Sequence, residues 1–338
     1  MNYIFKDESA LYYECGYSSD NAILIKAGSE VFFITDGRYA LEAKTSIRNA
    51  QIIISNDILK GASELLKNSH LKKIYFDPQE WSLHAYQILS RNSDTTFLPD
   101  KNLSQKRRII KSKEEQALLA KAVSLGSKAF DRFAKKLEKN IGKDERFLTD
   151  IAKRVLSKKG KYTLSFDPIV ALNANAANPH AKPSKDRLKK NDLLLFDAGL
   201  KYKRYCSDRT RVAYIDDAID FDLKQKIKDK KIQKVYDIVR KAHDRAIEKA
   251  RSGMKASQID ALARDVIEKS GYGKYFVHST GHGVGLDIHE MPFISSKSDI
   301  TIEDGMVFTI EPGIYLENEF GIRIEDMVVM KNSKAVIL

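Results

Sequence analysis

Four strand-like apolar segments in the C-terminal part of the chain each carry a carboxylate where a buried side chain is expected. Asp197 directly follows the apolar run at 193–196, and Asp208, Glu311 and Glu325 stand in the segments CSD, FTIE and IRIED. Burying an unpaired carboxylate costs several kcal/mol. If the four side chains converge they need positive charge, which divalent ions supply, because carboxylate oxygens and imidazole suit Mn, Co, Zn or Fe. The pattern therefore favours a metal centre.

Taken singly, each carboxylate also has an ordinary structural interpretation. Asp197 stands before Ala-Gly, as a turn residue would, and Asp208 has arginines close by in sequence with which to pair. Glu311 precedes Pro-Gly as a strand-end charge would, and Glu325 could face solvent beside another acid. Spacing alone does not decide between these interpretations and a shared cation site.

The histidines favour the cation site. His282 and His289 lie in HSTGHGVGLDIHE (278–290), where three glycines allow close approach of the backbone or a bulge. Seven residues separate the two histidines, which places them on opposite faces of a straight strand, so convergence requires a bend. We expect the more distant histidines to be surface or satisfied core residues, namely His70, His84 and His243.

Composition limits the other classes of function. A net charge of +12 and a pI of about 9.3 would suit nucleic-acid binding, but the basic stretches 105–113, 181–190 and 224–234 lack interleaved aromatics and a recognisable DNA-binding motif. We expect solvated helix faces and no nucleic-acid partner. There is no signal-peptide pattern and no apolar run near the ~20 residues of a membrane helix, so we expect a cytoplasmic protein without membrane contact. Two distant cysteines form no framework, and Cys206 stays unassigned, its interpretation as a small buried hydrophobe outweighing that as a metal ligand.

The first hundred residues alternate strand-like and helix-like runs, which predicts an α/β domain. They contain no phosphate-binding loop and no cluster of histidines and carboxylates. The following segments are predicted as strands: 21–27, 31–36, 51–55, 73–77 and 95–99. Helices are predicted between them at 38–47, 57–68 and 82–91.

A basic, apolar-poor stretch at 99–111 is the best linker candidate, so we expect domains over 1–108 and 109–338. Ser112 and Glu115 form a capping box before a helical apolar stripe. Further helices are predicted at 230–251 and 257–270, with Gly253 and Gly271 as C-terminal stops. Strands are predicted at 167–173, 192–199, 205–215, 305–315 and 321–330, which makes the second domain α+β.

Several motifs together resemble one family. NPHAKP (178–183), LLFDAGL (194–200), CSDRTR (206–211), HSTGHGVGLDIHE (278–290), TIEPGIY (309–315) and GIRIED (321–326) occur in the order found in the creatinase/methionine-aminopeptidase, or pita-bread, superfamily. The resemblance is to its aminopeptidase P and prolidase branch. GYSSDNAILI (16–25) and ITDGRY (34–39) resemble the N-terminal domain of that family.

The resemblance implies five ligands for two divalent ions, most simply Mn²⁺, with Co²⁺ or Zn²⁺ as alternatives. Asp197 would chelate one ion, His282 and Glu311 the other, and Asp208 and Glu325 would bridge the pair. A water or hydroxide shared by the ions would attack the scissile carbonyl.

The resemblance also implies roles for residues around the metals. Glu311 would take and relay the proton, while His289 and His180 would contact the substrate and steady the tetrahedral intermediate. His278 would belong to the proline-side pocket. Arg323 would orient the substrate and carboxylates, and would hold Glu325 in place.

The function so implied is a metal-dependent aminopeptidase that cleaves the bond before a proline in second position, acting as a homodimer. One alternative is a prolidase that cleaves only Xaa-Pro dipeptides, and another is a methionine aminopeptidase. A different class, a non-catalytic pita-bread binding scaffold, would suit the basic surface, but such proteins tend to lose metal ligands. All five ligand positions are retained here.

Overall fold

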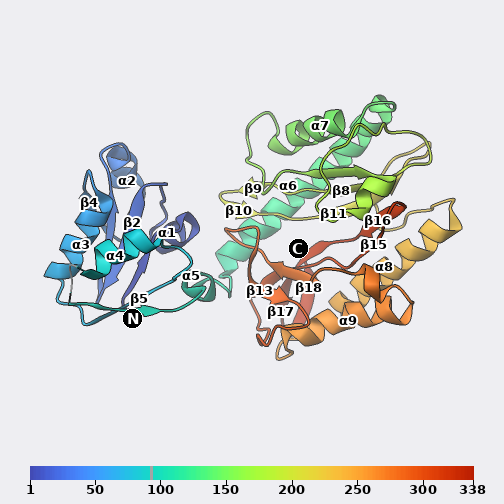
Figure 1. Ribbon diagram of the computed structural model, residues 1–338. Helices are drawn as coiled ribbons and strands as arrows, with labels where there is room; N and C mark the ends of the chain where they lie inside the picture. Colours follow the sequence, from blue (N-terminus) through green and yellow to red (C-terminus); the bar gives the residue numbers. More distant parts are fainter. Residues whose placement is uncertain (92–93) are drawn as a thin grey trace. The chain divides into compact units, whose positions relative to one another are not determined.

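The computed structural model describes residues 1–91 and 94–338, which form two compact units, Met1–Arg108 and Ile109–Leu338 (Figure 1). The N-terminal unit mixes strands and helices in alternation, as predicted. Its elements are β1 (Tyr3–Phe5), α1 (Glu8–Cys15), β2 (Ala22–Ala27), β3 (Glu30–Thr35), α2 (Ala40–Ser46), β4 (Gln51–Ile54), α3 (Ile58–Asn68), β5 (Lys73–Phe76), α4 (Leu83–Arg91), β6 (Thr96–Pro99) and α5 (Leu103–Arg107).

One six-stranded mixed sheet organises the N-terminal unit, in the order β4-β3-β2-β1-β5-β6. Strands β1, β2 and β3 pair antiparallel, whereas the outer pairs are parallel. Alternate residues of β1 enter different cores, because successive side chains of a strand point to opposite faces. Tyr3 and Phe5 pack with α1, and Ile4 packs with α3 and α4. The sequence analysis missed β1, α1 and α5.

Four long helices cover the sheets of the C-terminal unit. They are α6 (Lys113–Leu137), α7 (Glu145–Ser157), α8 (Lys230–Lys249) and α9 (Ala256–Lys269). The predicted capping box is present, because Ser112 accepts from the Glu115 N–H and Glu115 accepts from the Ser112 N–H. Gly271 follows the end of α9 at φ +83°, but α8 ends at Lys249, so Gly253 belongs to the next turn rather than to a helix stop.

The strands of the C-terminal unit pair antiparallel, and three short 3-10 helices, η1 (Glu138–Asn140), η2 (Asn173–Ala177) and η3 (Gly273–Tyr275), lie between the longer elements. The strands are β7 (Ile169–Leu172), β8 (Leu193–Asp197), β9 (Lys201–Tyr202), β10 (Tyr205–Cys206), β11 (Thr210–Tyr214), β12 (Gly281–Gly283), β13 (Glu290–Ile294), β14 (Val307–Ile310), β15 (Gly313–Leu316), β16 (Phe320–Arg323), β17 (Asp326–Lys331) and β18 (Lys334–Ile337). The order is β11-β8-β7 in one sheet and β13-β12-β14-β17-β18 in another, with β15-β16 and β9-β10 as separate pairs.

Each larger sheet has its own helix layer. Phe130 and Phe133 of α6 meet Phe196 of β8 with ring centroids 4.4 Å apart, in a core that α7 completes. Helices α8 and α9 pack on the five-stranded sheet. Figure 1 shows α6 and α7 on one side of the strands of this unit, and α8 and α9 on the other. This α+β arrangement confirms the predicted fold class.

Three segments predicted as single strands are each two strands. A break separates β10 from β11, β14 from β15, and β16 from β17. Asp208, Glu311 and Glu325 lie in these breaks. The candidate ligands therefore stand at strand ends, where the backbone changes direction, rather than within continuous ladders.

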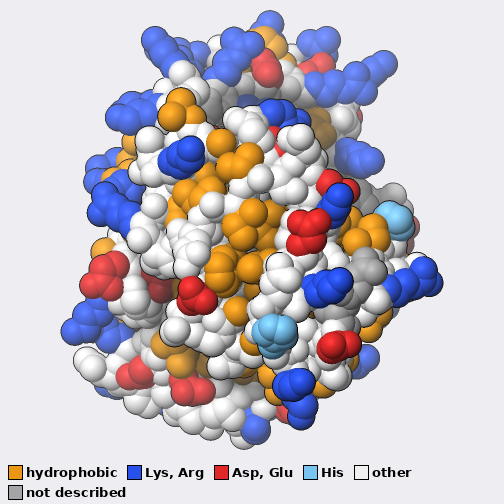
Figure 2. Space-filling model, turned by 90° about the vertical axis from the view of Figure 1, so that its left-hand side faces the viewer, with side chains coloured by type: hydrophobic (Ala, Val, Ile, Leu, Met, Phe, Trp, Pro, Cys, Tyr) orange, Lys and Arg blue, Asp and Glu red, His pale blue; other side chains and the backbone are white. Residues whose placement is uncertain are grey.

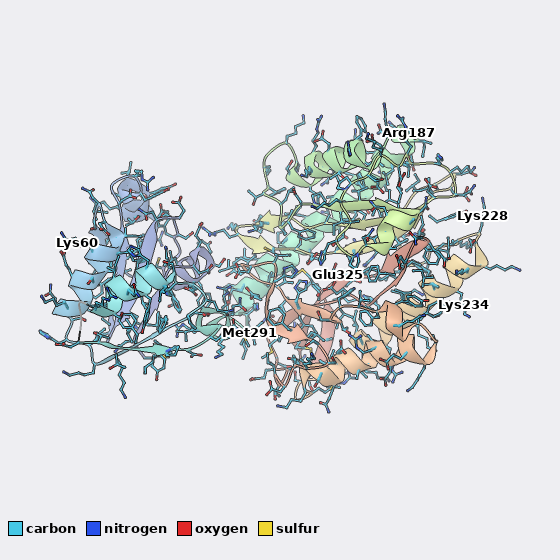
Figure 3. The ribbon with its side chains drawn as sticks, viewed as in Figure 1. Lys60, Arg187, Lys228, Lys234, Met291 and Glu325 are labelled. Atoms are coloured by element: carbon cyan, nitrogen blue, oxygen red, sulfur yellow. The ribbon has the colours of Figure 1, made fainter. Side chains whose placement is uncertain are left out.

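The sequence analysis also predicted that the chain has no membrane helix and that its basic stretches lie on solvated helix faces. Among the residues described, none of the helices combines the length and apolar character that a membrane crossing requires. On the face shown in Figure 2, Lys and Arg side chains are spread around the edge, with acidic side chains among them. Figure 3 places Lys228, Lys234 and Arg187 at the periphery of the C-terminal unit and Glu325 in its interior.

Candidate metal centre

Strand pairing brings the first two carboxylates together. Asp197 is the last residue of β8, and its register partner on β11 is Thr210. Asp208 stands two residues before Thr210, in the break after β10. The relative exposure of Asp197 is 8% and that of Asp208 is 5%. Both side chains thus enter the interior from one end of the three-stranded sheet.

The second pair comes from the five-stranded sheet. Glu311 follows β14 and Glu325 precedes β17, and these strands pair with Ile310 opposite Asp326. His282 lies on β12, next to β14. A side chain on the Gly281 Cα would lie 1.9 Å from the Thr309 carbonyl oxygen, so only glycine lets β12 approach this closely. This close packing places the His282 imidazole beside the carboxylates.

The five candidate ligands converge. Atoms of Asp208, His282 and Glu325 that could each bind a metal ion lie within 4.8 Å of one another. The His282 Nε2 is 3.2 Å from Glu311 Oε1 and 3.6 Å from Asp208 Oδ2. Asp197 lines the same cavity.

The electrostatics of this cluster call for a cation. Burial raises the pKa of Asp208 well above its usual value, and the charges of Glu325, Asp197 and Glu311 raise it further. The pKa of Glu325 is raised well above its usual value by burial and then by the Glu311 and Asp197 charges. In the described part of the chain, Asp197 Oδ1 and Asp208 Oδ1 are buried without a hydrogen-bond partner. Carboxylate oxygens and imidazole nitrogen are the donors that hard or borderline divalent ions take, so the residues fit a metal centre.

Arg323 supplies cationic charge on one side of the cluster. Its Nη2 donates to Asp197 Oδ2 over 2.6 Å and its Nε donates to Thr210 Oγ1 over 3.0 Å. Burial lowers the pKa of Arg323, but the neighbouring Tyr315 and Asp197 outweigh burial and leave it well above its usual value. Arg323 remains charged and fixes one oxygen of Asp197.

Glu325 is held differently from what the sequence analysis expected. The Thr210 hydroxyl donates to Glu325 Oε2 over 2.7 Å, and the Glu325 N–H donates to the Thr210 carbonyl over 3.1 Å. Within the described residues, Arg323 is therefore linked to Glu325 by hydrogen bonds only through Thr210. The sequence analysis did not identify Thr210. Thr210 stands two residues after Asp208, and side chains two residues apart in an extended segment point to the same face.

Glu311 has the opposite titration behaviour from the central carboxylates. Burial raises its pKa, but the hydrogen bond and charge of His282, followed by the charges of His278 and Arg323, leave its pKa at about 2. Thr309 also donates to Glu311, over 3.1 Å. Glu311 is therefore ionised at neutral pH.

Two further histidines approach the cluster. β12 and β13 form a hairpin with an irregular register at His282, and the His282 and His289 ring centroids lie 4.3 Å apart. The hairpin supplies the bend that their separation in sequence requires. Burial, followed by the His282 charge, lowers the pKa of His289, so its imidazole is neutral at neutral pH.

His278 lies on another wall of the cavity. Its Nε2 is 2.8 Å from the Tyr315 hydroxyl, which also accepts from Arg323 Nη1 over 2.8 Å. Burial lowers the pKa of His278 and raises that of Tyr315 to about 12. The sequence analysis did not identify Tyr315, whose position in TIEPGIY gives no chemical signal of its own.

A single cavity of about 470 Å³ contains the whole set. Apolar side chains form part of its wall, namely Phe166, Ile169, Ile288 and Phe293. The predicted site residues that line it are Asp197, Asp208, His282, Glu311, Glu325, His180, His278, His289 and Arg323. His180 and His289 are exposed, whereas the others are buried or partly buried.

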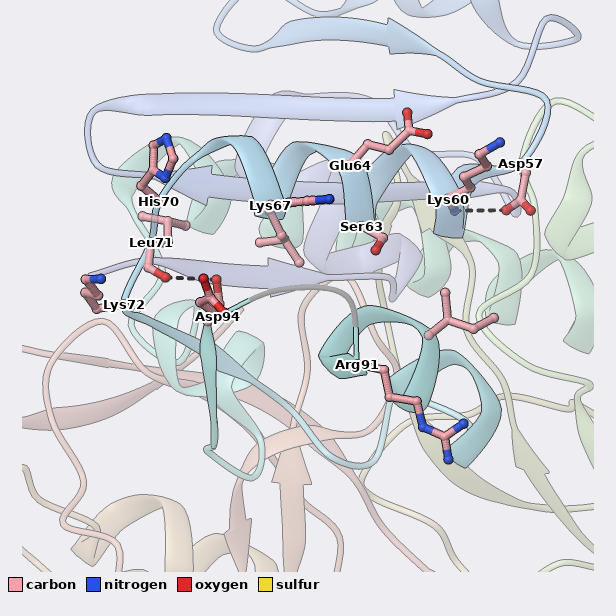
Figure 4. A pocket seen from close by; sticks show the side chains of 13 residues that line it. Asp57, Lys60, Ser63, Glu64, Lys67, His70, Leu71, Lys72, Arg91 and Asp94 are labelled. Atoms are coloured by element: carbon pink, nitrogen blue, oxygen red, sulfur yellow. Dashed lines mark hydrogen bonds between the residues drawn. The ribbon is translucent and has the colours of Figure 1, made fainter.

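A larger cavity, of about 710 Å³, lies in the N-terminal unit between α3 and α4 (Figure 4). Its lining mixes lysines with acidic residues, including Lys60, Lys67 and Glu64. Only one histidine, His70, is among its described lining residues. It has no convergent carboxylates like those of the C-terminal unit, so cavity size alone does not identify the site.

The other residues singled out in the sequence lie outside the cluster. The Cys206 thiol is buried against the Leu286 carbonyl, and burial raises its pKa to about 11, so it behaves as a small buried side chain. His243 is buried in α8 with its ring nitrogens close to Asp244 and Asp326. His84 lies on α4 in the N-terminal unit.

Comparisons with known proteins agree with this geometry. The model of metallopeptidase family M24 matches residues 117–332, and that of the creatinase/prolidase N-terminal domain matches residues 2–110. An Xaa-Pro dipeptidase from Lactobacillus delbrueckii subsp. lactis is 33% identical over 86% of this chain and 77% of its own length. A putative Xaa-Pro aminopeptidase from Mycoplasma genitalium is 36% identical over 95% of this chain and 87% of its own.

Solved structures give the same result. An Xaa-Pro dipeptidase from Bacillus anthracis superimposes with a TM-score of 0.91 at 29% identity, covering 99% of this chain and 92% of the other. An X-Pro aminopeptidase from Thermotoga maritima gives 0.88 at 28% identity, covering 99% and 94%. The chain belongs to metallopeptidase family M24, with a creatinase/prolidase N-terminal domain before the catalytic domain.

Proposed function

We propose that this chain is an Xaa-Pro aminopeptidase, which hydrolyses the bond between an N-terminal residue and a following proline. The observation that carries the proposal is the convergence of the four candidate ligand carboxylates, four histidines and Arg323 in one cavity, which Asp167 also lines. Relatives named for Xaa-Pro hydrolysis support the class of substrate.

The proposed metal ligands are Asp197, Asp208, His282, Glu311 and Glu325. Asp208 and Glu325 belong, with His282, to the group of donor atoms that lie within 4.8 Å of one another, and Asp197 and Glu311 line the same cavity. Asp208 and Glu325 would hold both ions. We propose Mn²⁺ as the metal, because the donor set is rich in carboxylate oxygens. When bound, a pair of divalent ions polarises the scissile carbonyl and lowers the pKa of water.

The chain's own groups would then handle protons and charge. Glu311 is ionised at neutral pH, and would accept the proton that water releases and pass it to the leaving nitrogen. The neutral His289 imidazole can donate an N–H to the carbonyl oxygen as negative charge develops there. Arg323 keeps Asp197 oriented.

The number of cationic side chains that line the cavity favours an aminopeptidase over a dipeptidase. Arg323 is the one Arg or Lys among the described lining residues, and its nitrogens already donate to Asp197, Thr210 and Tyr315. A dipeptide would bring a free carboxylate on its proline, which this lining does not neutralise. A longer peptide has a neutral amide there.

A prolidase remains the second candidate, because several relatives are named Xaa-Pro dipeptidase. The scaffold alternative is disfavoured, since all five candidate ligands converge and the oxygens of two of them are left for a cation. The ligands themselves do not separate these peptidases from a methionine aminopeptidase.

A substrate panel with Mn²⁺ tests the proposal. It contains an Xaa-Pro dipeptide, an Xaa-Pro-Pro tripeptide, a longer Xaa-Pro peptide and a Met-Ala peptide. Cleavage of the longer proline peptides but not the dipeptide is expected. Cleavage of the dipeptide alone would assign a prolidase, and preference for the Met-Ala peptide would refute proline specificity.

Two controls tie the activity to the metal centre. Exhaustive chelation should abolish hydrolysis, and Mn²⁺ or Co²⁺ should restore it. Glu311→Ala should remove far more activity than His70→Ala, which changes a histidine of the N-terminal unit. Equal activities of the two variants would contradict the role of Glu311.

A further inference from the structure

A buried glutamate outside the cavity holds both ends of one loop. Glu145 is the first residue of α7 and is fully buried, with 0% exposure. Its Oε1 accepts from the Leu172 N–H over 2.6 Å, at the end of β7. Its Oε2 accepts from Asn175 Nδ2 over 2.7 Å and from the Ser184 N–H over 2.5 Å. One carboxylate therefore joins the two ends of the segment 172–184.

Within the described part of the chain, no lysine or arginine forms a recorded ion pair with Glu145. Its recorded partners are three N–H donors, and the N-terminus of α7 favours a negative charge at this position. A buried carboxylate is costly unless it is hydrogen-bonded, so a residue retained only for packing would more simply be apolar. These hydrogen bonds indicate that the Glu145 carboxylate holds the two ends of the 172–184 loop together.

The loop that Glu145 closes carries His180 to the cavity. Pro179, His180 and Ala181 line the cavity, but the His180 imidazole is exposed and has no recorded hydrogen bond among the described residues. His278 and His282, by contrast, each have hydrogen bonds of their own. The position of the His180 ring therefore depends on the loop backbone.

The 172–184 loop also contacts β16, the strand that carries Arg323 of the cavity. The Ala176 carbonyl oxygen would lie 1.8 Å from a Cβ at Gly321, so the loop packs directly on the β16 backbone. Arg323 Nη1 also donates to the Pro179 carbonyl over 3.2 Å. The loop is thus held between Glu145 and β16, with His180 at its tip.

We propose that Glu145 is a positioning residue, which closes the 172–184 loop and thereby places His180 at the cavity. This inference rests on the proposed function for its effect on hydrolysis. It deepens that function by adding a residue that is not among the described residues lining the cavity and whose carboxylate binds Leu172, Asn175 and Ser184. A wholly structural role for Glu145 is the alternative that the experiment must exclude.

A double-mutant cycle separates positioning from general stability. Glu145→Gln keeps the shape but presents an amide N–H₂ to neighbouring donors, so it should lower kcat/KM on the order of 10-fold. In the His180→Ala background the same change should lower kcat/KM by less than about 2-fold, because the residue that it positions is gone. Equal losses in both backgrounds would overturn the proposal.

Two further variants test whether the loss of activity comes from the contacts between Glu145 and the loop. Asp144→Asn alters the neighbouring carboxylate, which caps α7 through the Phe147 N–H, and should leave activity unchanged. Asn175→Ala removes a donor to Glu145, together with the hydrogen bond from Asn175 Nδ2 to the Lys182 carbonyl within the loop, and leaves Glu145 in place, so it serves if Glu145→Gln does not fold. Asn175→Ala should also lose its effect in the His180→Ala background, and independence from His180 would count against the proposal.

A spectroscopic readout works whether or not the peptidase assignment is correct. The seven histidines can be labelled for NMR, with His180→Ala identifying one signal. Glu145→Gln should shift the His180 signal and Asp144→Asn should not, at unchanged Mn²⁺ affinity. An unshifted His180 signal, or weakened Mn²⁺ binding, would refute positioning. If wild type cleaves no proline peptide, the proposed function fails while this spectrum still decides the placement of His180.

Discussion

Arg323 and Asp197 form a buried ion pair in which Nη2 lies 2.6 Å from Oδ2, while the other oxygen of Asp197 has no hydrogen-bond partner in the described part of the chain. The arginine thus occupies one oxygen of the carboxylate and leaves the second available. Since an unpaired buried oxygen is costly, the arrangement is explained if a cation binds there. The same arginine donates to Thr210, which donates to Glu325, so one residue orients two proposed ligands.

Arg323→Lys should weaken Mn²⁺ binding on the order of 10- to 100-fold, as expected for loss of a partner that orients metal ligands. A lysine ammonium cannot reproduce the planar set of bonds to Asp197, Thr210 and Tyr315. Isothermal titration calorimetry measures the change. Arg154→Lys, in an exposed pair with Asp150 on α7, is the control and should bind Mn²⁺ as wild type does. Equal affinity of the two variants would contradict the role of Arg323.

Asp208→Asn should stabilise the protein without metal and destabilise it relative to wild type with metal. Burial and three neighbouring carboxylates raise the pKa of Asp208, so its ionised form is unfavourable in the folded protein without a cation. Mn²⁺ at 100 times its Kd should add about 2.7 kcal/mol to wild type. Calorimetric unfolding with EDTA and with Mn²⁺ measures both effects. A lower Tm for Asp208→Asn in EDTA would refute the charge argument.

The strand periodicity in the sequence was enough to predict the fold class, because long apolar runs such as 193–196 are buried regardless of context. It was not enough to place the strand breaks. Pro312 and Gly313 are a local signal for the break at Glu311, but Asp208 and Glu325 interrupt segments that look continuous in the sequence. The breaks at Asp208 and Glu325 depend on how the strands meet at the site, which local sequence does not encode.

The ionisable site residues could be named from the sequence, but their supports could not. Thr210 and Tyr315 are ordinary strand residues by composition, and they matter because pairing across the sheets brings their hydroxyl groups to Arg323. Glu145 lies outside every motif that was recognised. Its role depends on contacts with residues 27 to 39 positions away along the chain. Such contacts emerge only from the packed structure.

His289→Ala should chiefly lower kcat, on the order of 10²-fold or more, and change KM little. The neutral imidazole is proposed to meet the oxygen only as charge develops in the transition state. His278→Ala should instead chiefly raise KM, because that side chain is proposed to contact the proline side of the substrate. Steady-state kinetics on an Xaa-Pro-Pro tripeptide distinguish the two. A purely KM effect of His289→Ala would exclude a transition-state role.

Glu80 should make the N-terminal unit less stable as pH rises. Its Oε2 accepts from the Lys6 and Asp7 N–H groups, and burial, opposed by these two bonds, raises its pKa from 4.5 to about 7. The folded state therefore holds the proton more tightly than the unfolded state. This contribution to stability is fully present below pH 4.5 and is lost as pH rises through 7, by at most about 3.5 kcal/mol at about 1.4 kcal/mol per unit.

Hydrogen exchange of the β1 and α1 segment, corrected for the chemical rate, measures this loss. Protection should be greater at pH 5 than at pH 8 in wild type, and Glu80→Gln should largely remove the difference, because its amide does not titrate. Glu64→Gln on the exposed side of α3 is the matched control and should retain the wild-type dependence. Since Glu80 lies in the N-terminal unit, Mn²⁺ should not change the difference. Equal pH dependence in Glu80→Gln and wild type would show that another group controls the stability of this segment.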